Sequence, residues 1–140
     1  MRRTLIAGVV AAGVVLVVGG CSSLTEPEVV TDFQWTEVDP EIMEEGVVAT
    51  VALGELFILG QVPTPTRCYR VDFGFEKRGS KLTLQIDATT SMTENCDLSP
   101  GGYRYTLGVY NLKSGTYELR VFHDVSGGQA RAFTQTVTIR

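Results

Sequence analysis

The residues of this chain best suited to covalent chemistry are its three cysteines, Cys21, Cys68 and Cys96. Cys21 ends a long apolar run, whereas Cys68 and Cys96 lie in the more polar remainder and form an even pair. Disulfides persist outside the reducing cytoplasm, so this pairing depends on export. In the chain-entropy description, such a bridge stabilises a fold by about 3–4 kcal/mol. We therefore predict a Cys68–Cys96 disulfide, with two separate buried thiols as the alternative.

The first 20 residues have the composition of an export signal. Arg2 and Arg3 give a positive start, and residues 5–20 are apolar or glycine throughout. This run is shorter than the roughly 20 residues that a transmembrane helix needs. It ends in Val18-Gly19-Gly20, directly before Cys21.

The VGGC sequence at 18–21 resembles the lipobox of bacterial lipoprotein precursors, in which an aliphatic residue and two small residues precede a cysteine. The resemblance implies cleavage before Cys21, diacylglycerol on its thiol, and fatty acyl chains such as palmitate on the mature protein. Two or more such chains hold a protein stably on a membrane. Leucine is commoner than valine at the first position, so Val18 departs slightly from the pattern. A secretory signal cleaved nearby and an uncleaved signal anchor are the alternatives.

His123 is the only histidine of the chain. It shares the predicted inward face of Leu119 and Val121, near the end of a strand. A nucleophilic triad would need a hydroxyl and a carboxylate to converge on it, and Asp124 next to it points to the opposite face of a strand. We interpret His123 as a hydrogen-bonded residue at the rim of the fold.

No spacing in the chain is typical of a metal or cofactor site. H-x-x-H, C-x-x-C and calcium-loop patterns are missing, and the Gly-Gly pairs at 101–102 and 127–128 indicate turns. The sequence therefore predicts no metal, no cofactor and no catalytic residue. Two acids for glycoside hydrolysis stay open as an alternative, because sixteen acidic residues always allow some pair.

Aromatic side chains are one indication of a binding surface. Tyr110 and Phe122 fall on the outward positions of their predicted strands, and Trp35 lies near the start of the domain. Exposed aromatics that gather on one surface mark contacts with a partner or ligand. We predict these three as candidate binding residues, with isolated surface aromatics as the alternative.

The segment 60–66 is the second indication of binding. It contains Pro63 and Pro65, which remove backbone donors and bias their neighbours away from helix, so we expect it to be extended and irregular. Its position beside Cys68 would make it a rigid displayed loop. A plain strand crossover is the alternative.

Strands are the elements that must position these residues. Apolar and polar residues alternate with a period of two over 69–75, 82–88, 103–109 and 117–123, and turn residues separate the runs. With the runs at 47–59 and 133–139, and a first strand that starts at Val29-Val30, the pattern predicts an all-β fold: an antiparallel β-sandwich of about seven strands. The apolar positions form the predicted core: Tyr69, Val71, Phe73, Leu84, Ile86, Tyr105, Leu107, Tyr117, Leu119, Val121 and Val137.

The segment LKSGTYELRV at 112–121 resembles the tyrosine corner before the penultimate strand of immunoglobulin-like and fibronectin-like domains. The resemblance implies an immunoglobulin-like sandwich and assigns no function. The cysteines depart from the immunoglobulin pattern, because neither lies two residues after Tyr117.

The chain thus divides into a signal peptide at 1–20, a lipidated N-terminus and tether at 21–32, and a β-sandwich domain at 33–140. Its net charge of −4, more negative once Arg2 and Arg3 are removed, disfavours nucleic acid as a partner.

We expect a membrane-anchored lipoprotein of the cell envelope that acts as a non-catalytic binding or structural module. Ser22 in place of Asp implies the outer membrane if the host is Gram-negative. The expected partner is an envelope protein or glycan. A small envelope hydrolase and a protease inhibitor that uses the 60–68 loop are the alternatives.

Overall fold

The computed structural model describes residues 27–40, 44–91, 95–128 and 130–140, so the predicted signal peptide and Cys21 lie outside the described residues. The described part is almost entirely β. No helix that could cross a membrane is found in it. The strands are β1 (Val30–Glu37), β2 (Gly46–Ala52), β3 (Glu55–Thr64), β4 (Tyr69–Arg78), β5 (Lys81–Thr90), β6 (Gly101–Tyr110), β7 (Gly115–Val125) and β8 (Arg131–Ile139).

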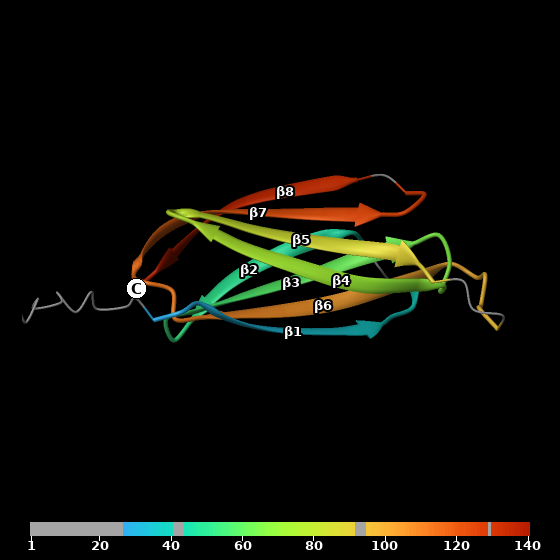
Figure 1. Cartoon of the computed structure of the whole chain (residues 1–140), viewed down its shortest axis with the longest axis horizontal. Helices are drawn as coiled ribbons and strands as arrows, with labels where there is room; N and C mark the ends of the chain where they lie inside the picture. Colours follow the sequence, from blue (N-terminus) through green and yellow to red (C-terminus); the bar gives the residue numbers. More distant parts are fainter. Residues whose placement is uncertain (1–26, 41–43, 92–94, 129) are drawn as a thin grey trace, which may run out of the picture.

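These strands form two four-stranded sheets that face each other (Figure 1). The first sheet has the order β1-β6-β3-β2 and the second has the order β4-β5-β7-β8. The predicted all-β, two-layer class is confirmed. The structure has eight strands where about seven were predicted, because the 47–59 run folds into a hairpin of two strands.

The prediction of a purely antiparallel sandwich is wrong at one place, since β5 and β7 pair in parallel. Between them the chain crosses to the first sheet as β6, so β7 returns in the same direction as β5. Alternation of side chains reports which face of a strand is buried. It does not report the direction of the neighbouring strand.

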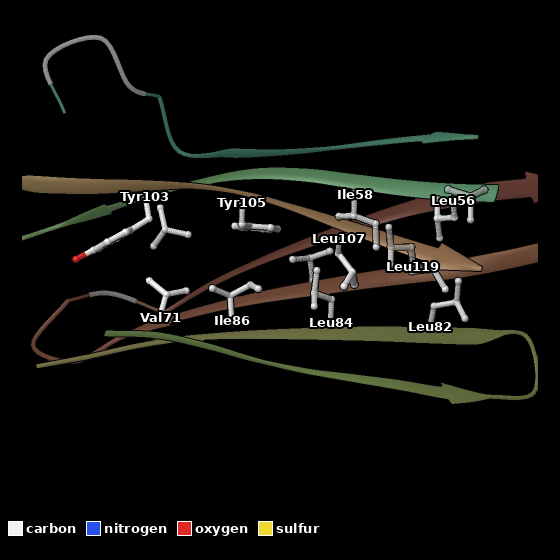
Figure 2. Packing of buried hydrophobic residues seen from close by; sticks show 14 of the residues in the cluster. Leu56, Ile58, Val71, Leu82, Leu84, Ile86, Tyr103, Tyr105, Leu107 and Leu119 are labelled. Carbon is white, nitrogen blue, oxygen red and sulfur yellow. The ribbon is translucent and has the colours of Figure 1, made fainter. Parts of the chain in front are cut away.

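The core lies between the sheets, and each sheet contributes the inward half of its alternating residues (Figure 2). Tyr105 and Leu107 of β6 face Leu84 and Ile86 of β5 across this layer. Every predicted core residue is buried except Phe73. Fully burying one large apolar side chain contributes about 1.5–3 kcal/mol, so this layer is the main stabilising feature of the fold.

Phe73 is the exception because β4 is an edge strand. Its side chain is 38% exposed and stacks on Phe33 of β1, with 4.3 Å between the ring centroids. Phe73 does point toward the other sheet, as predicted, but it lies at the open side of the sandwich, where the edge strands β1 and β4 face each other. There the two rings close the gap between the sheets.

Gln135 of β8 bridges the other open side. Its Oε1 accepts from the backbone N–H of Ala49 at 3.3 Å, and its Nε2 donates to the carbonyl of Ala49 at 3.2 Å. The side-chain amide thus occupies both backbone groups of an edge-strand residue, as a neighbouring strand would.

The prediction that segment 60–66 is irregular is wrong for residues 60–64, because β3 continues to Thr64. Pro63 is opposite Gly102 of β6, beyond the last residue that pairs with β2. Proline is tolerated in a strand where one side of the strand has no neighbour, because the missing N–H then removes no ladder bond.

The Cys68–Cys96 disulfide is present, with 5.5 Å between the two Cα atoms. It ties the start of β4 to the connection between β5 and β6. The adjacent backbone N–H of Arg67 donates to the carbonyls of Asp97 at 3.2 Å and Ser99 at 3.0 Å. The disulfide and these hydrogen bonds therefore both hold the 65–68 segment against residues 96–99.

A hydrogen bond lies at the turn before β7. The hydroxyl of Tyr117, at the start of β7, donates to the carbonyl of Lys113 at 2.8 Å. This bond fixes the turn through which the chain crosses from the first sheet to the second.

The described connections lie at the two ends of the long axis (Figure 1). We call one end the N-end; it carries 27–29, 53–54, 79–80, 111–114 and Arg140. The opposite end, the far end, carries 38–40, 44–45, 65–68, 95–100 and 126–128 among the described residues.

Candidate functional site

A buried polar network lies near the far end, centred on His123 of β7. His123 is 0% exposed, so it lies inside the sandwich and not at the predicted rim. The predicted hydrogen bonding is confirmed: Nε2 is 2.8 Å from the hydroxyl of Tyr105, and Nδ1 is 3.2 Å from Oε1 of Glu45. A carboxylate only accepts, so Nδ1 donates to Glu45 and Nε2 accepts from the phenol.

The environment keeps both rings of this network uncharged. Burial lowers the pKa of His123, and the hydrogen bond and negative charge of Glu45 oppose this effect only in part. Burial raises the pKa of Tyr105 above its usual value, and the charge of Glu45 adds to the shift. Both side chains are neutral near pH 7 as a result.

Gly60 of β3 creates the space that Tyr105 needs. The two residues are opposite each other in neighbouring strands, and a Cβ at position 60 would overlap Cζ and the hydroxyl of Tyr105. The ring therefore lies across β3, where its hydroxyl reaches His123. A glycine inside a strand often marks such a close approach.

Glu45 connects this interior network to the surface. Its side chain is 21% exposed, and its Oε2 lies 3.5 Å from Nε of Arg131. Two depressions meet at this residue. The larger, of about 520 Å³, is lined by Glu44, Glu45, Gly46, Val47, Val48, Thr50, Leu59, Gly60, Gln61 and Arg104. The smaller, of about 240 Å³, is lined by Glu45, Pro63, Thr64, Pro65, Val125, Gly128 and Arg131.

The larger depression, here called the Glu45 cleft, has an apolar floor between charges of both signs. Val48 is 62% exposed and Leu59 is 42% exposed, and the two are opposite each other on the outward face of the first sheet. Glu44 and Glu45 directly precede β2, and Arg104 of β6 is opposite Gln61 of β3. The cleft is within the size range of ligand sites, about 300–1,000 Å³.

The network does not have the geometry of a nucleophilic triad. The hydrogen bonds of the two ring nitrogens go to a phenol and a carboxylate, and the ring itself is inaccessible. No group of three His, Cys, Asp or Glu side chains that could hold a metal ion is found within the described part of the chain.

The structure does not bring the predicted aromatic residues together. Tyr110 lies on the outward face of the first sheet, edge-on to Phe57 at 6.2 Å between centroids. Phe122 points outward from the second sheet, on the other side of the molecule. Trp35 is 42% exposed on edge strand β1 and packs edge-on against Tyr103.

The two predicted prolines lie closer to the candidate site. Pro63 and Pro65 are both exposed and line the smaller depression beside Glu45. Because β3 includes Pro63, the predicted 60–68 loop is a strand end followed by a short bend, and not a free loop.

Sequence reasoning missed Glu45 and Arg104. Glu45 stands in an acidic run that is typical of a solvated loop, and nothing local shows that its carboxylate meets a buried histidine. One signal was available: Gly60 interrupts an apolar strand run, which indicates that another group approaches the backbone there.

We compared the chain with known proteins in three ways. A scan against protein-family models, a search of curated proteins and a search of solved structures each returned no match. The candidate site therefore stands on its own geometry: a cleft with an apolar floor, whose wall Glu45 is hydrogen-bonded to the buried His123, which Tyr105 contacts in turn.

Proposed function

We propose that the protein is a lipid-anchored, non-catalytic binding module of the bacterial cell envelope. The VGGC sequence at 18–21 supports export and lipid attachment at Cys21. The Cys68–Cys96 disulfide supports a location outside the reducing cytoplasm. The outer membrane is the proposed location if the host is Gram-negative, on the basis of Ser22.

The Glu45 cleft is the observation that carries the binding proposal. Its floor of Val48 and Leu59 suits an apolar side chain, and the acids at one side and Arg104 at another suit polar groups of both signs. An extended peptide segment of an envelope protein has this chemistry. The proposed ligand is such a segment, with one apolar side chain placed between a basic and an acidic group.

We further propose a local relationship to immunoglobulin-like domains. The hydrogen bond from Tyr117 to Lys113 and the two-layer architecture support it. The parallel β5–β7 pair departs from the immunoglobulin strand order. The resemblance therefore concerns the corner and the layers, and assigns no ligand.

Site-specific photo-crosslinking in the native envelope tests the binding proposal. A photoreactive residue at position 48 should crosslink to a discrete partner protein. The same probe at position 136, on an exposed residue of β8 in the second sheet, should not. Arg104→Ala should reduce the crosslinks severalfold. Arg120→Ala, an exposed arginine of β7 in the second sheet, is the matched control and should leave them unchanged. Equal crosslinking at 48 and 136 would refute the cleft as the binding site.

The anchor is tested separately with Cys21→Ser. The wild-type protein should partition into detergent and carry added acyl mass on residue 21, whereas the variant should remain an unlipidated precursor. A native N-terminus at any other residue, without lipid, would exclude the lipoprotein assignment.

A further inference from the structure

Leu53 stands where the local backbone disfavours it. It forms the two-residue β2–β3 turn with Gly54, and the φ angles are 54° for Leu53 and 78° for Gly54. A turn with positive φ at both positions is of type I′, which strongly prefers Asn-Gly. The leucine side chain is 101% exposed, so no packing within the described fold compensates for this conformation.

The chain emerges from the fold at the same end as Leu53. The side-chain amide of Asn111 donates to the carbonyl of Glu28 at 3.1 Å, which fixes residue 28 at the N-end. Pro27 is six positions after Cys21 in sequence, and a chain of that length spans at most about 20 Å. A lipid on Cys21 therefore keeps the N-end within about that distance of the bilayer.

Basic residues lie in the other turns of this end. Arg78 and Lys81 flank the β4–β5 turn, Lys113 lies in the β6–β7 turn, and Arg140 follows β8 with its carbonyl near Gly54. Glu28, Glu55 and Glu76 are at this end too, and Glu76 accepts from Arg78 at 2.7 Å. The far end carries six acids, against Arg67 and Arg131 among the described residues there: Glu37, Asp39, Glu44, Glu45, Asp97 and Asp124. The named cations of the N-end thus outnumber its named acids, whereas acids outnumber cations at the far end.

We infer that the N-end is a membrane-contacting surface, in which Leu53 enters the interface of a bilayer with anionic headgroups. The exposed side chain of Val30 at the same end adds apolar area. The cations of the N-end then face the lipid headgroups, an attraction that salt screens. The inference rests on the proposed lipid anchor at Cys21. It gives a functional reason for Leu53 at a turn position that disfavours leucine.

Depth-sensitive fluorescence tests this surface. The mature protein, extracted from its own membrane, is labelled with an environment-sensitive fluorophore at Leu53→Cys and reconstituted in vesicles of phosphatidylcholine with phosphatidylglycerol. Leu98→Cys is the matched control, because Leu98 is 69% exposed at the far end. Label 53 should shift to the blue and be quenched severalfold more than label 98 by nitroxide on the lipid headgroups. The difference should shrink in pure phosphatidylcholine.

Equal quenching at positions 53 and 98 would overturn the inference. Intact mass of the same preparation reports the state of Cys21 and so judges the anchor separately. If Cys21 carries no lipid, the anchor proposal fails. Vesicles added to the soluble protein then test the membrane-contacting surface without the anchor. Quenching of label 53 would support this surface, and no quenching would reject it.

Discussion

His123 is buried beside a carboxylate and a phenol, and its pKa lies below the unfolded value because burial disfavours the charged ring. The unfolded chain therefore binds a proton more readily than the folded protein. This contribution to the free energy of unfolding is complete well above pH 6.5 and is lost as the pH falls through 6.5 toward the lower folded pKa.

The pH dependence gives the first prediction. Urea denaturation should show the wild type losing stability as the pH falls through about 6.5, the pKa of an unfolded histidine. His123→Gln keeps one donor and one acceptor but cannot be protonated, so its slope over this range should be smaller. Identical slopes would show that His123 does not titrate between the folded and unfolded states.

Gly60 gives the second prediction, since its missing side chain makes room for Tyr105. Gly60→Ala should destabilise the fold by about 1–3 kcal/mol or more, because the new Cβ forces the ring out of its place. Gly46→Ala is the matched control in the same sheet, since no atom lies within 4 Å of a Cβ there. If both variants unfold at the same denaturant concentration, the close approach of Tyr105 is wrong.

At the scale of the elements, the open sides of the sandwich are closed by single side chains. Gln135→Ala removes both hydrogen bonds to Ala49, so edge strand β2 should open more often. We expect faster amide hydrogen exchange at Ala49 and a loss of about 1 kcal/mol. Thr136→Ala, at an exposed position of the same strand, should leave exchange at Ala49 unchanged.

On the opposite open side, we expect Phe73 to contribute less to the free energy of unfolding than Leu84 in the closed layer. Phe73→Ala should cost only about 1–2 kcal/mol, because its ring is already partly in water. Leu84→Ala should cost about 2–5 kcal/mol, because it leaves a cavity in the closed layer. Equal losses in chemical denaturation would show that the Phe33–Phe73 side is as closed as the centre.

These elements also show what alternation predicts and where it stops. A period of two identified the buried faces of β4 to β7, because one face must contact the core. It could not show that β4 is an edge strand, that β5 and β7 are parallel, or that Pro63 lies in a strand. Each of these depends on strand order. The hydrogen bonding of His123 was predictable from its face, but its partner Glu45 is 78 residues away in sequence.

At the scale of the whole molecule, a substitution at the hairpin tip should stabilise the fold while it removes the leucine of the proposed membrane contact. Leu53→Asn creates the preferred Asn-Gly turn and should raise the free energy of unfolding of the protein by about 1 kcal/mol, since leucine is strained at positive φ. A higher melting temperature in detergent checks this. No gain would mean that the turn holds leucine without strain.

Every strand runs between the N-end and the far end, so strand length sets how far the far end lies from the N-end. At about 3.3 Å per residue, a strand as long as β7 extends roughly 35 Å. If the N-end rests on lipid, the sandwich is a rigid spacer that lifts Val48, five residues before Leu53, by roughly 17 Å, with Glu45 farther out. A partner could then meet the cleft only in a layer at that level above the bilayer. Its own length, or the depth at which it is embedded, would decide whether it can bind.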